Sequence, residues 1–127
     1  VVFLDLDHFK ELNDLHGRDF GDEALKYVAV HLRVMSRESD IVARFAGDEL
    51  VVILPHTEGE NAFRFSDRIQ TFFLTNPMRR GEAHVTLSLS CGVATNRDRN
   101  VSDASSLLRK ADERLGMSKR IKKGKVR

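Results

Sequence analysis

Two short apolar segments joined by a tight turn limit the fold of this 127-residue chain more than any other feature. Residues 40–45 read DIVARF and residues 50–55 read LVVILP, and both contain the β-branched residues that favour strands. The residues between them, AGDE, include a glycine, which accepts the positive φ of hairpin turns. Pro55 ends the second segment, because proline has no N–H for a strand ladder. The two segments are therefore predicted to pair as antiparallel neighbours.

The other segments place this hairpin in a domain of mixed composition. The apolar run VVFLDL at residues 1–6 predicts a buried strand, and the alternating residues 84–95 predict a further strand. Helical spacing of apolar residues predicts four helices, over residues 9–16, 22–35, 58–76 and 103–119. This order predicts an α+β fold, with a central, mainly antiparallel sheet flanked by helices, as in ferredoxin-like palms. In that topology the first strand lies beside the hairpin, which brings Asp5 near the carboxylates of the turn.

The length predicts one domain over residues 1–127. Because the chain opens directly on the strand VVFLDL, we expect this domain to be a fragment of a larger multidomain protein. No apolar run approaches the roughly 20 residues of a membrane span. The single cysteine, Cys91, cannot form an internal disulfide, which favours a reducing compartment and a cytoplasmic location. The net charge of +2 is too small to indicate a nucleic-acid-binding protein, although the final segment KRIKKGKVR is basic. That segment is either a solvated helix end or a set of cations for phosphate.

Carboxylates at the strand ends are the main candidates for chemistry. Alternation along a strand sends Asp5 and Asp7 to the same face, and Asp48 and Glu49 follow in the turn. Such anions repel one another unless a cation lies between them, and Mg²⁺ is usually bound by one or two carboxylates plus substrate phosphates. From the carboxylates alone two interpretations remain open. They form a metal and nucleotide site, or they are solvated turn residues.

Five sequence blocks, in order and in register, decide between these interpretations. DLDHFKELND, GDEAL, RFAGDEL, LSCGVAT and LLRKADERL together resemble the GGDEF domain of diguanylate cyclases over nearly the whole chain. The resemblance implies the palm-type fold of nucleotidyl cyclases. It also implies that two GTP-loaded domains form a homodimer, which condenses two GTP into cyclic di-GMP with release of pyrophosphate. Mg²⁺, with Mn²⁺ as a substitute, is the implied cofactor.

The resemblance also implies roles for individual residues. Asp5, Asp48 and the backbone carbonyl of Leu6 are the expected metal ligands, and Asp48 is also the expected proton acceptor. Glu49 assists with the metal or the hydroxyl. The expected nucleotide contacts are made by Phe9, Lys10, Asn13, Asp22, Gly47, Lys119 and Lys123, of which Asn13 and Asp22 bind guanine and the lysines bind phosphate. Taken singly, Asn13 also fits a local cap and Asp22 a helix N-terminal acid.

A second motif is expected to bind the product. Arg37 and Asp40 form an RxxD sequence shortly before the turn, and Arg68 lies at the position of a supplementary arginine. By resemblance these three residues form a product-inhibition site for cyclic di-GMP. Arginine side chains suit this role because their planar donors match phosphate and guanine edges.

Several residues depart from the family pattern. Ala46 and Leu50 replace the first glycine and the phenylalanine of the signature, and Arg18, Gly116 and Lys123 replace the usual His, Tyr and Arg. The DxLT segment that usually precedes the first strand is not in this chain. Two alternatives to an active cyclase therefore remain. One is an inactive GGDEF module that binds GTP or cyclic di-GMP and regulates a covalently linked sensor or phosphodiesterase domain, and the other is a dimerisation module without nucleotide.

Overall fold

The computed structural model describes residues 1–126, with side chains through Lys122, and contains a four-stranded antiparallel sheet. Its strands lie in the order β2-β3-β1-β6, so β1 is central, between β3 and β6. The strand bounds are β1 Val2–Leu6, β2 Ile41–Ala46, β3 Glu49–Ile53 and β6 Leu89–Val93. The predicted hairpin is confirmed, and β1 lies beside it as expected.

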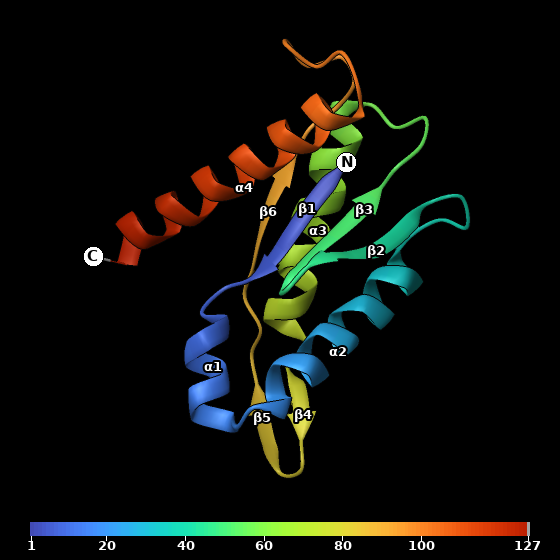
Figure 1. Ribbon diagram of the computed structural model, residues 1–127. Helices are drawn as coiled ribbons and strands as arrows, with labels where there is room; N and C mark the ends of the chain where they lie inside the picture. Colours follow the sequence, from blue (N-terminus) through green and yellow to red (C-terminus); the bar gives the residue numbers. More distant parts are fainter. Residues whose placement is uncertain (127) are drawn as a thin grey trace.

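Helices cover both faces of the sheet (Figure 1). Helices α2 and α3 pack on one face, α4 lies across the other face over β1 and β6, and the short α1 connects the end of β1 to α2. Their bounds are α1 Phe9–His16, α2 Asp19–Met35, α3 Gly59–Thr75 and α4 Ala104–Val126. The predicted α+β palm arrangement is therefore confirmed.

Strand β1 is buried throughout and is apolar except for Asp5, because both of its faces are covered. Val2, Leu4 and Leu6 belong to the core cluster under α2 and α3. Phe3 points the opposite way and packs with Ala111 and Leu115 of α4. Asp5 shares the face of Phe3, so alternation along the strand places its carboxylate on the α4 side of the sheet.

Helix α4 approaches β6 unusually closely at Gly92. A Cβ atom at this position would overlap the backbone carbonyl oxygen of Ala111 and the backbone nitrogen of Leu115. Only glycine permits this separation, which fixes the distance between α4 and the sheet. The helix also continues through Gly116 without interruption.

The expected single strand over residues 84–95 is wrong in its extent. The structure divides it into β5, Ala83–Val85, and β6, and β5 pairs instead with β4, Met78–Arg80, in a separate hairpin. Gly81 forms the turn of this hairpin with φ of 62°. The alternation continues across the break because Val85, Leu87 and Leu89 are all buried, so the pattern of side chains does not reveal where the ladder stops.

The α4 face of the sheet is only partly covered. Ile41 of β2 and Ile53 of β3 are exposed, and Phe45 is 52% exposed while its ring centroid lies 5.0 Å from that of Phe3.

None of the helices in the described residues is long and apolar enough to cross a membrane.

Candidate active site

Asp5 is the central residue of the candidate site. On β1 its Cα partners are Glu49 of β3 on one side and Ser90 of β6 on the other. Its side chain is only 10% exposed, although carboxylates are rarely buried without a partner. Asp48, in the turn between β2 and β3, is close enough to affect the ionisation of Asp5. The structure therefore brings together the acids that the sequence predicted to meet.

The two oxygens of Asp5 have different surroundings. Oδ2 forms an ion pair with Lys119, whose Nζ lies 2.6 Å away. Oδ1 is buried and has no hydrogen-bond partner among the described residues. The pKa of Asp5 is raised to about 6, mainly by burial, with Lys119 opposing the rise and Asp48 adding to it. A buried oxygen without a partner beside a second carboxylate is an environment that a cation would stabilise.

Asp7 does not share this environment, although the sequence grouped it with Asp5. Its Oδ1 accepts a hydrogen bond of 2.6 Å from Ser90, and its Oδ2 accepts bonds from Ser88 and Lys122 of 2.6 Å and 2.8 Å. Burial alone would raise the pKa of Asp7, but these hydrogen bonds outweigh burial and lower it. Each strand-end aspartate thus has its own lysine from α4.

Glu49 lies beside a further carboxylate that the sequence interpretation missed. Burial raises the pKa of Glu49, and the negative charges of Asp112 and Asp48 add to the effect. Asp112 is two helical turns before Lys119, on the same side of α4, and this spacing was the available signal. An open pocket of about 570 Å³ lies here. Its lining includes Asp5, Glu49, Asp112, Lys119 and Arg120.

The turn that carries Asp48 has a defined backbone shape. Gly47 has φ of 47°, which favours glycine, and its carbonyl oxygen accepts a 2.8 Å hydrogen bond from Arg44 Nε. The pairing of β2 with β3 shifts between Arg44 and Ala46, as at a β-bulge. Ala46 is exposed and Leu50 is buried, so both departures from the signature fit their surroundings.

Helices α1 and α2 bring together the residues expected to contact the base. Asn13 Oδ1 accepts a 2.7 Å hydrogen bond from the backbone N–H of Gly21, the residue before Asp22. This bond agrees with the alternative in which Asn13 acts as a local cap. It uses only Oδ1, so the side-chain NH₂ group is left for other partners. Phe9 is half-buried against the core, whereas Lys10 and Asp22 are exposed. Lys123 lies outside the side chains that the structure describes.

The donor set suits a cation that shares its coordination with a substrate. Within residues 1–126, no three His, Cys, Asp or Glu side chains are grouped so as to bind a metal ion. The strand ends instead supply Asp5 and Asp48, and Mg²⁺ commonly binds one or two carboxylates and completes its shell with phosphates and water. Leu6 can offer this site only its backbone carbonyl, since its side chain is buried in the core.

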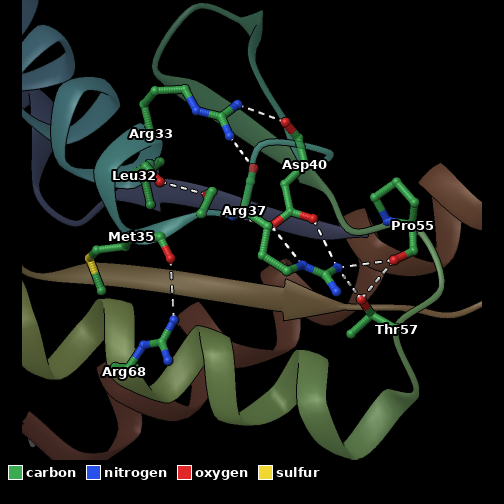
Figure 2. A network of polar contacts seen from close by, with 9 residues as sticks. Leu32, Arg33, Met35, Arg37, Asp40, Pro55, Thr57 and Arg68 are labelled. Atoms are coloured by element: carbon green, nitrogen blue, oxygen red, sulfur yellow. Dashed lines mark hydrogen bonds and ion pairs between the residues drawn. The ribbon is translucent and has the colours of Figure 1, made fainter.

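The RxxD residues form a compact network between α2 and the loop after β3 (Figure 2). Arg37 Nη2 lies 3.0 Å from Asp40 Oδ1 and also donates to Thr57 Oγ1 and the carbonyl oxygen of Pro55. Burial alone would raise the pKa of Asp40, but the hydrogen bonds from Arg37 outweigh burial and lower it. Arg68 of α3 donates to the carbonyl oxygen of Met35 at 3.4 Å, two residues before Arg37. The Arg37 side chain remains 56% exposed and accessible to a ligand.

Comparison with known proteins gives a consistent result. The family described as "Diguanylate cyclase, GGDEF domain" matches residues 1–125. In Pseudomonas aeruginosa, the cyclic di-GMP phosphodiesterase NbdA is 42% identical over 94 residues, which are 74% of this chain and 12% of NbdA. The diguanylate cyclase TpbB of the same species is 37% identical over 129 residues, covering 100% of this chain and 29% of TpbB. The chain thus spans under a third of the length of these relatives.

Solved structures agree with the sequence relatives. The crystal structure of the TpbB GGDEF domain superposes with a TM-score of 0.85 at 36% identity, covering 94% of this chain and 74% of that one. The GGDEF domain of DgcB from Caulobacter crescentus, solved in complex with c-di-GMP, gives a TM-score of 0.83 at 26% identity. That match covers 94% of this chain and 70% of the DgcB chain.

Proposed function

The chain belongs to the GGDEF domain family of diguanylate cyclases, and on that premise we propose that it condenses two GTP molecules into cyclic di-GMP. The observation that carries the proposal is the buried Asp5. Its Oδ1 has no partner among the described residues, Asp48 is adjacent, and Lys119 contacts its other oxygen. A structural acid would be fully paired, as Asp7 is.

Asp5, Asp48 and the Leu6 carbonyl would bind Mg²⁺, or Mn²⁺ in its place. When bound, the ion would neutralise phosphate charge and help to align the reacting groups. Lys119, whose Nζ lies 2.6 Å from Asp5 Oδ2, is the first expected phosphate contact, and Lys10 and Lys123 are further cations. Asn13 has its amide N–H donors available for the base, and the Asp22 carboxylate can accept the N–H groups of guanine.

In the proposed reaction the 3′-oxygen of each GTP bonds to the α-phosphorus of the other, and pyrophosphate leaves. The hydroxyl proton passes to Asp48, while Glu49 assists nearby. One domain binds one GTP, so two domains must face each other as a homodimer for the hydroxyl to reach its target. We propose a cytoplasmic location, where GTP is available, and a covalently linked sensor or phosphodiesterase domain as the partner.

A second candidate function is a GTP or cyclic di-GMP receptor without turnover. Ala46 in the signature favours it, and so does the similarity to NbdA, a relative named as a phosphodiesterase. Against it, Asp5, Asp48 and Glu49 are all present, and Ala46 lies at an exposed position.

The test is GTP turnover with Mg²⁺ at increasing protein concentration, with the product separated by chromatography and Asp48→Ala as the control. Cyclic di-GMP formation, with specific activity that rises with concentration and is lost in Asp48→Ala, would establish the cyclase. GTP binding without product would favour the receptor. No nucleotide binding, together with unchanged dimerisation of Asp48→Ala, would favour a dimerisation module.

A further inference from the structure

We propose that Lys122 is a positioning residue that fixes Lys119 against Asp5 through its ion pair with Asp7. This inference rests on the proposed function, since Lys119 is there a phosphate contact. Lys122 belongs to a group of four residues with Asp7, Ser88 and Ser90, called the Asp7 cluster below.

The two lysines and the two aspartates match in spacing. Lys119 and Lys122 are three residues apart on α4 and therefore lie on one side of the helix. Asp5 and Asp7 are two residues apart at the end of β1 and share one face of the sheet. The resulting ion pairs, Lys119 with Asp5 at 2.6 Å and Lys122 with Asp7 at 2.8 Å, join the helix to the central strand.

These ion pairs hold a part of α4 that has few other contacts. Ala111 and Leu115 are buried against the sheet, but no residue from Gly116 to Lys122 is buried. Met117 and Ile121 are 52% and 57% exposed. A glycine at position 116 also lowers the helix propensity just before Lys119. The position of the Lys119 ammonium group therefore depends mainly on the contacts that attach α4 to the sheet beyond Leu115.

The Asp7 cluster is the more firmly bonded of the two attachments. Both oxygens of Asp7 accept hydrogen bonds, and Ser90 is completely buried. The three N–H donors of Lys122 have three acceptors, which are Asp7 Oδ2, the Leu89 carbonyl at 2.5 Å and Ser88 Oγ at 3.5 Å. With its donors engaged, Lys122 acts on a nucleotide through Lys119 rather than by contact.

Lys119 is in the opposite situation. Asp5 Oδ2 is its ion-pair partner, and a phosphate can replace that carboxylate without breaking a larger network. The Asp7 cluster stays formed during such an exchange, so it keeps Lys119 within reach of both partners. This division separates an anchoring lysine from a ligand-binding lysine on the same helix.

The experiment measures binding of 3′-deoxy-GTP, which lacks the attacking hydroxyl, by calorimetry on the full chain with Mg²⁺. Lys122→Met is expected to weaken binding about fivefold or more, and Lys122→Arg to restore most of it. Lys110→Met, the same change three turns earlier in α4, is the matched control and should bind as the wild type does. Thermal unfolding verifies that each variant is folded.

A double-mutant cycle separates positioning from general stabilisation. If Lys122 acts through Lys119, then Lys122→Met has no further effect on binding in the Lys119→Met background. Additive losses, or unchanged binding by a folded Lys122→Met protein, would overturn the inference. Should Lys122→Met fail to fold, Ser88→Ala takes its place with the same expectation, because it removes the hydrogen bonds of Ser88 to Asp7 and Lys122.

Absence of the proposed nucleotide site gives a different result, because the wild-type protein itself then binds no 3′-deoxy-GTP. A receptor without turnover still binds this analogue, so the binding test applies to it unchanged. Amide hydrogen exchange over residues 116–122 then decides whether the Asp7 cluster positions Lys119. Faster exchange in Lys122→Met than in Lys110→Met supports the positioning role, and equal exchange rules it out.

Discussion

Asp5 of β1 and Glu49 of β3 lie directly opposite each other in the sheet, as Cα partners of an antiparallel pair. The register of β1 with β3 alone therefore places a carboxylate from the first strand next to the acids of the turn. Residues 44 apart in sequence become neighbours in this way, and the candidate site needs no long loop to assemble it.

Replacing Asp5 by Asn is expected to abolish turnover while the fold remains. Asn has the same shape but no charge, so it loses both the ion pair with Lys119 and the affinity for a cation. Activity should fall about 100-fold or more, the scale on which a lost electrostatic group acts in an active site. Product formation and circular dichroism are the measurements. Activity near that of the wild type in Mg²⁺ would show that the carboxylate is not a required ligand.

Replacing Gly21 by Ala is expected to weaken nucleotide binding and to lower the stability of the protein. The new Cβ would overlap the ring of Phe9 and lie 2.8 Å from Asn13 Oδ1, so the two side chains must move. Both side chains are expected nucleotide contacts. Overpacking of this kind lowers folding stability by about 1–3 kcal/mol. Calorimetric titration with GTP and with ATP tests this. A variant with unchanged affinity and selectivity would show that neither side chain needs its present position.

Replacing Gly92 by Ala is expected to destabilise the protein by about 1–3 kcal/mol or more, because α4 must move away from β6. Urea unfolding measures the change. Gly116→Ala is the control, since its Cβ would meet only Arg120 Nη1 at 3.5 Å, and better helix propensity should stabilise that variant by up to about 1 kcal/mol. Equal stability of Gly92→Ala and the wild type would mean that α4 is not held at this distance.

Replacing Arg37 by Ala is expected to weaken cyclic di-GMP binding without lowering GTP affinity. The charged hydrogen bonds of an arginine make a loss of about tenfold or more reasonable. Arg37 also contacts Pro55 and Thr57, so stability must be measured in parallel. Arg64→Ala, which removes an exposed arginine paired with Glu60, is the control. Unchanged affinity for cyclic di-GMP would remove Arg37 from the product site.

Acid is expected to destabilise the protein partly through Asp98. Burial alone would raise the pKa of Asp98, but hydrogen bonds from Arg114 and the backbone of Thr95 outweigh it and lower the pKa. A carboxyl with a lowered folded-state pKa stabilises the protein fully above its ordinary pKa of about 3.9. The contribution is lost as the pH falls from that value through the folded-state pKa.

Urea unfolding between pH 3 and pH 6 tests this expectation with Asp98→Asn. The stability difference between the wild type and the variant should be largest near pH 6 and should shrink below about pH 4. A difference that stays constant over this range would mean that the ionisation of Asp98 does not contribute.

Local patterns in the sequence determined most of the elements of this fold. The AGDE hairpin, the buried first strand and the four helices followed from turn residues and apolar spacing, because these features depend on residues close together in the chain. The family resemblance rested on the same local blocks. The end of the strand pairing between Val85 and Leu89 was not predictable, since the side chains remain buried across the gap between β5 and β6.

The sequence by itself determined that acids lie at the strand ends, and only the tertiary structure decided which of them is free to act. Asp5 and Asp7 look equivalent in DLD, yet Asp7 is saturated by Ser88, Ser90 and a lysine 115 residues away, whereas one oxygen of Asp5 has no partner in the described part of the chain. Ionisation and hydrogen bonding depend on the distances between groups in space. Those distances follow from the packing of α4 on the sheet.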